Sequence, residues 1–345
     1  MTRMIFTVAG DGISRRNTKS PENRRQWFSG RFYQANRLSS PQRFDCNFTV
    51  SSSPKIHIIT GPTAVGKTAY ALTWAEAHKA EIVSCDALLL YRGMDIGTAK
   101  PTPDEQARVP HHGIDVWPVD QPGSVVDYVR IAREAVESIH VRGKSVVVVG
   151  GSGFYLKAFF APVADQIVID AAIKSTVAEA YSREGLAGLV RRLHALNPEG
   201  LNGLDILNPR RVIPALERCL ASGKTLAGLR AAFARQSSPF AHVEKHVTLL
   251  QREEADLLNR VEIRTRAMLK AGLVDEVKQL RVAGLESNPA AASAIGYRET
   301  LAWLDAGSTD YEALAQAIIT GTRRLIKKQR TWFRHQLPVD VLLRL

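Results

Sequence analysis

Cysteine is scarce in this sequence, and long hydrophobic runs are missing from it. The 345 residues include three cysteines, Cys46, Cys85 and Cys219, which lie too far apart to form a C-x-x-C pair. This spacing excludes a disulfide framework and a zinc ribbon, and it fits a reducing cytoplasm. No apolar run approaches the roughly 20 residues that a membrane helix needs, and the first residues are too polar for a secretory signal. We therefore expect a cytoplasmic protein without a membrane partner.

Acidic residues are outnumbered by basic ones, 34 to 46, which gives a formal net charge of +12. A chain this basic attracts polyanions such as nucleic acid, anionic lipid or phosphorylated ligands. Half of the excess falls in residues 1–54, where nine basic residues stand against three acidic ones. This segment lacks apolar periodicity, so we interpret it as a disordered basic N-terminal extension. Its Arg-rich, acid-poor composition also resembles an organelle transit peptide.

From residue 55 onward, strand and helix patterns alternate. Short apolar runs at 55–60, 81–85 and 145–149 predict buried parallel strands, and the periodicity over 66–78 and 125–140 predicts helices. This alternation indicates an α/β fold, with a P-loop NTPase-like parallel sheet flanked by helices.

The pattern becomes helical after Pro162. We predict a helical insertion domain over 165–205 that contacts the substrate, and a catalytic core formed by 55–164 and 206–345. The run at 247–250 predicts a strand that returns to the sheet. The remaining predictions are helices over 253–281, 293–305 and 311–336, and an edge strand over 339–343.

Residues 61–68 follow the pattern G-x-x-x-x-G-K-T of a phosphate-binding P-loop. The glycines let backbone amides turn toward phosphate oxygens, and the following helix adds its positive end. Lys67 supplies a mobile charge, and the Thr68 hydroxyl suits Mg²⁺. The predicted diphosphate-binding loop consists of Gly61, Pro62, Thr63, Ala64, Val65, Gly66, Lys67 and Thr68.

Two further side chains stand out on chemical grounds. Asp86 follows the strand predicted over 81–85, where open α/β sheets place ligand-contacting residues. Beside a P-loop such a carboxylate serves as a general base or binds the metal through water, and the alternative is a helix cap or solvated loop acid. Arg264 shares one helix face with Leu257, Val261 and Met268, so it needs an anionic partner. A bound phosphate and a protein acid both meet that need.

Several segments occur together, in order and at plausible spacing. They read GPTAVGKT at 61–68, DALLLYRGMDIGTAKP at 86–101, HHGID at 111–115, VGGSGFY at 149–155, NPRR at 208–211, ALE at 215–217, SGKT at 222–225, IGYR at 295–298 and KKQRTW at 327–332. On these segments, and over about residues 55–336, the chain resembles the bacterial tRNA dimethylallyltransferases.

The resemblance implies a reaction and roles for individual residues. A dimethylallyl group moves from its diphosphate to the exocyclic N6 amine of the adenosine 3′ of the anticodon, in tRNAs that read UNN codons. Asp86 would take the proton, while Thr63 and Arg264 would bind the diphosphate, with Mg²⁺ at Thr68. The implied partners are dimethylallyl diphosphate and the tRNA anticodon stem-loop. We expect a monomer, because one site and one tRNA are sufficient. The implied tRNA contacts are Asp86, Ala87, Leu88, Leu89, Ser152, Lys174, Arg210, Arg211, Gly296, Tyr297 and Arg298.

Three positions depart from the family pattern. Ala87 and Leu89 stand where many members have Ser and Gln, and Pro214 stands where Arg is expected. These departures concern expected tRNA contacts, while the residues of the chemistry are present. Two alternatives remain: a P-loop small-molecule kinase that uses ATP, and a catalytically decayed homologue that binds tRNA.

Two further features of the sequence are a stripe of basic residues and a pair of neighbouring histidines. Arg323, Lys327, Arg330 and Arg334 recur at i, i+4, i+7 and i+11, opposite Ile318, Leu325 and Trp332. This basic stripe is either an RNA contact or an ordinary solvated face. The His111–His112 pair lacks further ligands at suitable spacing, so we expect packing or hydrogen bonding and not a metal site.

Overall fold

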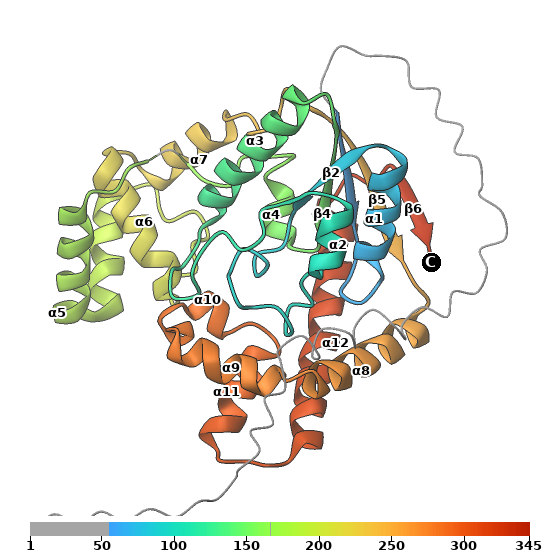
Figure 1. Ribbon diagram of the computed structural model, residues 1–345. Helices are drawn as coiled ribbons and strands as arrows, with labels where there is room; N and C mark the ends of the chain where they lie inside the picture. Colours follow the sequence, from blue (N-terminus) through green and yellow to red (C-terminus); the bar gives the residue numbers. More distant parts are fainter. Residues whose placement is uncertain (1–54, 166) are drawn as a thin grey trace, which may run out of the picture. The chain divides into compact units, whose positions relative to one another are not determined.

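The structure is a computed structural model that describes residues 55–165 and 167–345 (Figure 1). All of these residues belong to one compact unit. The extension predicted over 1–54, including Cys46, lies outside the described residues. Within the described ranges, no helix has the length and apolar character needed to cross a membrane.

Six parallel strands form the central sheet in the order β3-β2-β4-β1-β5-β6. Their bounds are β1 Lys55–Thr60, β2 Ala80–Ser84, β3 His111–His112, β4 Ser145–Gly150, β5 Glu244–Gln251 and β6 Val341–Arg344. The predicted strands are therefore present, with β6 at one edge. Strand β3 was not predicted, because two residues carry no recognisable periodicity.

Helices cover both faces of this sheet. One face packs against α3 (Val125–Val141) and α4 (Gly153–Lys157), and the other against α1 (Lys67–Ala77) and α8 (Glu254–Lys270). Helix α12 (Tyr311–Gln336) contributes to both sides, with Ile319 and Ile326 on the α1 side and Phe333 on the α3 side. Neighbouring residues of one strand, such as Val147 and Val148 of β4, are both buried but belong to opposite faces. This explains why β4 reads as an unbroken apolar run. The predicted α/β fold with a helix-flanked parallel sheet is confirmed.

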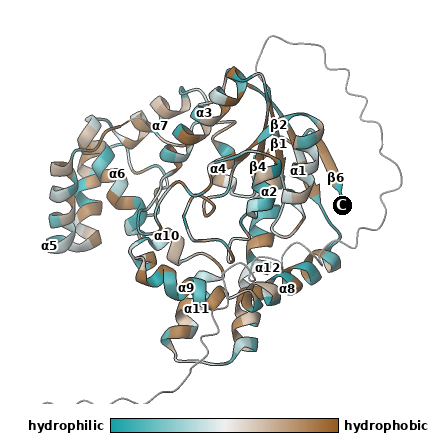
Figure 2. Cartoon of the chain, in the orientation of Figure 1, coloured by the Kyte–Doolittle hydropathy of each residue, from teal (hydrophilic) through white to brown (hydrophobic). Residues whose placement is uncertain are grey.

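Glycine interrupts one of the predicted helices and delays the start of another. The segment predicted as one helix over 253–281 forms α8 and α9 (Leu273–Val282), because Gly272 takes a left-handed φ of 100° between them. The segment predicted over 293–305 lies after α10 (Pro289–Ala292) and becomes helical only at α11 (Tyr297–Asp305), because Gly296 takes a φ of 94° before it. Figure 2 shows hydrophilic and hydrophobic residues alternating along α8 and α9, as expected for helices with one buried face.

Three helices share a hydrophobic cluster of their own. These are α5 (Ala171–Leu196), α6 (Pro209–Ser222) and α7 (Leu226–Ala234), and their cluster includes Val177, Leu189, Leu193, Val212, Leu216 and Leu226. The buried Asn197 side chain ties them together, since it donates to Leu193 O at 2.7 Å and accepts from Leu226 N at 2.5 Å. The cluster therefore extends beyond the boundary predicted at residue 205.

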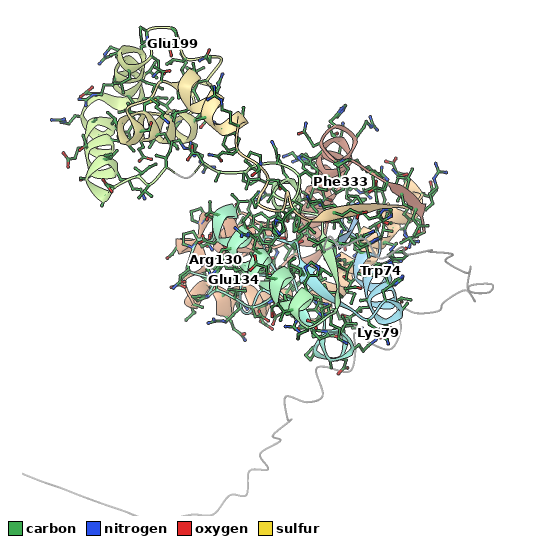
Figure 3. All side chains as sticks on the ribbon, turned by 90° about the horizontal axis from the view of Figure 1, so that it is seen from above. Trp74, Lys79, Arg130, Glu134, Glu199 and Phe333 are labelled. Atoms are coloured by element: carbon green, nitrogen blue, oxygen red, sulfur yellow. The ribbon has the colours of Figure 1, made fainter. Side chains whose placement is uncertain are left out.

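A column of stacked rings packs α1 against the sheet. Trp74 on α1 (Figure 3) stacks between His57 of β1 and His78, with ring centroids 4.4 and 4.1 Å apart. His57 also lies 5.0 Å from the ring of His246 on β5. Burial lowers the pKa of His57 to about 4, and the neighbouring His246 and His78 act in the same direction. The column therefore favours a neutral imidazole at its centre.

Two remaining short elements follow the second strand. Helix α2 (Pro103–Arg108) begins with a reciprocal capping box between Thr102 and Glu105. In β3, His112 Nε2 lies 2.7 Å from Glu81 Oε2, and His111 Nδ1 lies 2.7 Å from Val109 O. The histidine pair thus has the hydrogen-bonding role expected from the sequence.

Candidate functional site

The P-loop connects the central strand β1 to α1. Gly61 has φ 154°, and a Cβ atom there would lie 2.6 Å from Leu250 O, so the turn requires glycine. Lys67 folds back over the loop and donates to Gly61 O and Pro62 O, both at 3.0 Å. The ammonium group therefore lies above the loop, where a bound phosphate would replace these carbonyl contacts.

Two arginines hold the loop through its carbonyl groups. Arg252 Nε donates to Val65 O at 3.3 Å, and its Nη1 pairs with Asp256 at 2.7 Å. Arg260 Nε donates to Ala64 O at 2.9 Å. Because these carbonyls are already engaged, the loop is shaped before any ligand binds. Sequence reasoning missed both arginines, since their backbone partners lie 187 and 196 residues away.

Asp86 stands in the turn that follows β2. Its Oδ1 accepts from Leu88 N at 3.0 Å, and the adjacent Ala87 N donates to Ser152 Oγ at 3.1 Å. The end of β4 lies close beneath, because a Cβ atom on Gly150 would meet Cys85 O at 2.0 Å. The turns after β2 and β4 thus support each other, and Ser152 acts as a backbone acceptor within this arrangement.

Lys67, Asp86 and Arg264 interact electrostatically. Burial lowers the pKa of Lys67 to about 8, while the Asp86 carboxylate raises that pKa and Arg264 lowers it. Burial also lowers the pKa of Arg264, against the opposing effect of Asp86. Arg264 Nη2 donates to Thr98 O at 3.1 Å. The fold therefore brings three predicted site residues together, with two desolvated cations.

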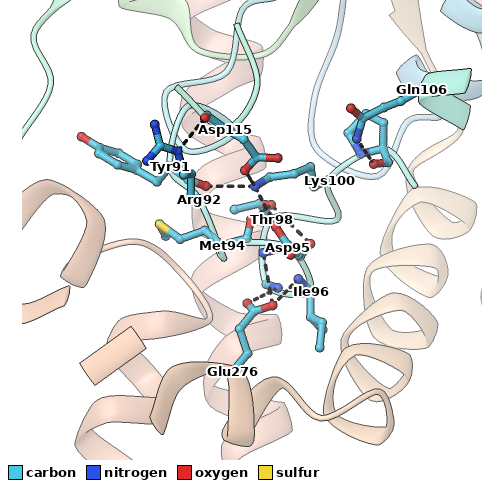
Figure 4. A network of polar contacts seen from close by, with 12 residues as sticks. Tyr91, Arg92, Met94, Asp95, Ile96, Thr98, Lys100, Gln106, Asp115 and Glu276 are labelled. Atoms are coloured by element: carbon cyan, nitrogen blue, oxygen red, sulfur yellow. Dashed lines mark hydrogen bonds and ion pairs between the residues drawn. The ribbon is translucent and has the colours of Figure 1, made fainter. Parts of the chain in front are cut away.

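The segment that presents Thr98 is fixed by a polar network (Figure 4). Lys100 is almost fully buried and contacts Tyr91 O at 2.9 Å, Asp95 at 2.7 Å and also Asp115. Glu276 of α9 accepts four hydrogen bonds at 2.6 to 3.1 Å; the donors are Asp95 N, Ile96 N, Gly97 N and Tyr297 Oη. Burial raises the pKa of the Glu276 carboxyl, and these donors oppose that rise. This network holds the carbonyl that Arg264 contacts.

Eight of the eleven predicted tRNA contacts fall into two groups. Asp86, Ala87, Leu88, Leu89 and Ser152 are partly buried and lie in the turns after β2 and β4. Lys174, Arg210 and Arg211 are exposed on α5 and α6, within the helical cluster. The fold therefore does not gather all of the predicted residues at the P-loop.

Tyr297 has a different role from the one predicted. Its side chain is fully buried, and its hydroxyl donates to Glu276 at 2.7 Å. A ring in this position has no surface to offer tRNA, so we assign it to packing. The neighbouring Gly296 begins α11 and is buried, while Arg298 is exposed and pairs with Glu299. Of these three residues, Arg298 alone presents its side chain to solvent.

Helix α12 carries the basic stripe on its exposed side. Arg323, Lys327 and Arg334 are exposed, and Arg330 lies 3.4 Å from Glu254. The buried face consists mainly of Ile318, Ile326 and Phe333, while Leu325 and Trp332 are only partly buried. Sequence reasoning missed Gln329 on this helix. Its Oε1 accepts from Thr63 N at 2.9 Å, and its Nε2 donates to Gly151 O at 3.1 Å.

A parallel sheet with a P-loop after its central strand and a carboxylate after β2 defines a phosphate-binding protein of the P-loop α/β class. A family model described as IPP transferase matches residues 89–336. The chain is 56% identical over 292 residues to a tRNA dimethylallyltransferase of Opitutus terrae, covering 85% of this chain and 94% of that protein. A second tRNA dimethylallyltransferase, from Salinispora tropica, is 40% identical, covering 80% and 84% of the two chains.

Solved structures agree with this assignment. The full-length tRNA isopentenylpyrophosphate transferase of Bacillus halodurans matches with a TM-score of 0.60 at 32% identity, over 84% of this chain and 89% of that one. A eukaryotic dimethylallyltransferase solved acting on tRNA shares the fold, with a TM-score of 0.73 at 24% identity over 85% and 74% of the chains. The chain therefore belongs to the IPP transferase family and is a transferase. The resemblance seen in the sequence is confirmed, and the kinase alternative loses its support.

Proposed function

We propose that this chain transfers the dimethylallyl group of dimethylallyl diphosphate to the N6 amine of the adenosine 3′ of the anticodon, in tRNAs that read UNN codons. The observation that carries the proposal is that Lys67, Asp86 and Arg264 lie within electrostatic range of one another, so that two cations face one carboxylate. Such a set suits a reaction with an anionic leaving group and a proton to remove. The names of the relatives support the choice of donor and acceptor.

In the proposed reaction the N6 nitrogen attacks the carbon that carries the diphosphate. The new C–N bond forms while the C–O bond breaks, and its electron pair leaves with the diphosphate. The amine then gives one proton to the Asp86 carboxylate. Leu88 N holds Oδ1 of that carboxylate at 3.0 Å, which leaves Oδ2 to receive the proton.

The leaving diphosphate gains negative charge as the C–O bond breaks. The P-loop amides, Lys67, Arg264 and the Thr63 hydroxyl would bind it, and their effect is large because the two cations are desolvated. Binding an anion also favours the charged form of Lys67, whose pKa burial has lowered. The same groups therefore bind the donor and stabilise the leaving group.

We propose that the Thr68 hydroxyl would hold Mg²⁺ beside the donor diphosphate. Within residues 55–165 and 167–345, no cluster of three or more His, Cys, Asp or Glu could hold a metal ion. This arrangement suits Mg²⁺, which commonly binds through substrate phosphates and keeps several waters. When bound, the ion neutralises charge on the diphosphate.

The acceptor adenosine has to leave its stack to reach a partly buried carboxylate. We propose that the turns at Ala87–Leu89 and Ser152 surround the flipped base. Lys174, Arg210, Arg211, Gly296 and Arg298 would contact the rest of the anticodon stem-loop, with the α5–α7 cluster as the tRNA-contacting part. We further propose that the protein acts as a monomer in the cytoplasm, since one site and one tRNA are sufficient.

A transfer assay tests the proposal. The full chain is mixed with labelled dimethylallyl diphosphate, unmodified tRNA and Mg²⁺, without ATP, and the label is mapped on the tRNA. We expect label on the adenosine beside the anticodon. Asp86→Asn should lower the transfer rate by at least about a hundredfold and leave tRNA affinity within about twofold, because it removes the base and keeps the shape. Asp104→Asn, an exposed residue of α2, is the matched control.

Each contrary result has a distinct meaning. Wild-type transfer rates in Asp86→Asn would refute the general-base role. Tight tRNA binding by the wild-type chain without any transfer would identify a decayed homologue. ATP turnover without tRNA binding would restore the kinase alternative.

A further inference from the structure

We propose that Gln329 is a positioning residue that sets the P-loop against the turn supporting Asp86. This inference rests on the function proposed above, in which the P-loop binds the diphosphate and Asp86 takes the proton. The Gln329 amide accepts from Thr63 N at 2.9 Å and donates to Gly151 O at 3.1 Å. These partners lie 266 and 178 residues away in the sequence, so one side chain joins two distant segments of the site.

The place of Gln329 on α12 points to a specific role. It lies on the buried face of the helix, three residues after Ile326 and four before Phe333, which are 4% and 3% exposed. A polar amide on such a face costs free energy unless both of its ends find partners, and a leucine would fill the space without that cost. Both ends of Gln329 are hydrogen bonded. The two bonds thus account for an amide at this position.

The turn after β4 is built to admit this helix. A Cβ atom on Gly151 would lie 2.9 Å from Gln329 Nε2 and 3.3 Å from Gly61 O. A Cβ atom on Gly153 would lie 2.7 Å from the ring of Trp332, on the same helix. The absence of a side chain at both positions therefore leaves room for Gln329 and Trp332 to approach this turn.

Gln329 reaches both halves of the site through these contacts. On one side it holds the backbone of Thr63, whose hydroxyl we assign to the diphosphate. On the other side Gly151 precedes Ser152, and Ser152 Oγ accepts from Ala87 N beside Asp86. The amide therefore sets the separation between the diphosphate cradle and the base. Reactions of this kind lose up to about a hundredfold in rate when reacting groups shift by about 1 Å.

Gln329→Met tests the proposal because it keeps the length of the side chain and removes both hydrogen bonds. The matched control is Gln316→Met, at an exposed position of α12 whose side chain bonds Glu312 at 3.0 Å. The full chain is titrated with inorganic pyrophosphate and Mg²⁺ at pH 7, and kcat for transfer is measured separately. We expect Gln329→Met to raise the Kd of pyrophosphate about tenfold and to lower kcat at least about tenfold, with tRNA affinity unchanged.

A double-mutant cycle separates positioning from plain structural support. Thr63→Ala removes the hydroxyl but keeps the N–H that Gln329 holds. If Gln329 acts by placing that hydroxyl, Gln329→Met should change the Kd of pyrophosphate less than about twofold in the Thr63→Ala background. A full tenfold effect in both backgrounds would show support of the fold alone and overturn the proposal, as would unchanged binding in Gln329→Met.

The pyrophosphate titration does not depend on prenyl transfer. A wild-type chain that shows the expected cycle but transfers nothing would refute the proposed function and leave the positioning role standing. A wild-type chain that does not bind pyrophosphate would overturn both.

Discussion

At the scale of single residues, Lys67 should make the affinity of the site for pyrophosphate depend on pH. Its pKa of about 8 in the free protein results from burial, and a bound diphosphate favours the charged form. Binding above pH 8 therefore requires proton uptake, and affinity falls as the pH rises. We expect the Kd of pyrophosphate to be about tenfold higher at pH 9 than at pH 7, measured by titration calorimetry.

Lys67→Arg provides the control for this prediction, because arginine stays charged throughout the range. Its affinity is expected to be weaker and flat between pH 7 and pH 9. A similar decline in both proteins would assign the pH dependence to another group.

The residues that sequence reasoning found are those whose signal is local. The P-loop glycines, Lys67 and Thr68 fall within eight positions of the sequence. Asp86 lies two residues after the end of β2, next to Cys85. Arg252, Arg260, Glu276 and Gln329 escaped because their partners come from distant segments. A usable sign did exist for Gln329, since an amide between Ile326 and Phe333 interrupts an apolar helix face. Tyr297 was predicted as a tRNA contact because it belongs to a motif. A motif does not show whether the ring points to the surface or into the core.

At the scale of elements, helix α9 is joined to the 91–100 segment by one carboxylate. Glu276→Ala would leave three backbone N–H groups and the buried Tyr297 hydroxyl without their acceptor. We expect a loss of about 3 kcal/mol or more in the free energy of unfolding, measured with urea. Asp275→Ala, the exposed neighbour on α9, should stay within about 0.5 kcal/mol.

The same variant also tests how Arg264 is held. Because the segment that Glu276 fixes also carries Thr98, the Kd of pyrophosphate should rise together with the loss of stability. Equal stability in Glu276→Ala and Asp275→Ala would show that the four hydrogen bonds contribute little.

Element types were easier to predict than element ends. The apolar runs of β1, β2 and β4 and the periodicity of α3 and α12 were sufficient to place those elements. The helix break at Gly272 and the late start of α11 after Gly296 were missed, because a single glycine inside a periodic pattern is consistent with an unbroken helix until its φ is known. The extent of the α5–α7 cluster depended on the contacts of Asn197, which no pattern in the sequence reveals.

At the scale of the whole molecule, the stacked column around His57 should make the free energy of unfolding depend on pH in the acidic range. The pKa of His57 is lowered to about 4 in the folded protein, against 6.5 for a free histidine. Between these values the unfolded chain binds the proton and the folded one does not, so stability falls as the pH drops from 6.5 to 4. The contribution of this one group is on the order of 2–3 kcal/mol.

Thermal unfolding of the wild-type chain and of His57→Phe across this pH range checks the prediction. Phenylalanine keeps a ring beside Trp74 but cannot titrate, and it removes the contact to Thr248 Oγ1 at 3.1 Å. The variant is therefore expected to be less stable at pH 7 and to lose less stability on acidification. Parallel pH profiles would place the acid sensitivity elsewhere.

The order of the strands has a consequence for how the chain reaches its folded state. Strand β1, which leads into the P-loop, lies between β4 and β5, and β5 ends at Gln251. During synthesis β1 emerges early, yet it lacks one neighbour until about two hundred further residues have been made. Contacts this distant in sequence slow folding and expose a strand edge meanwhile. The cradle for the substrate is therefore among the last parts of the nascent protein to be completed.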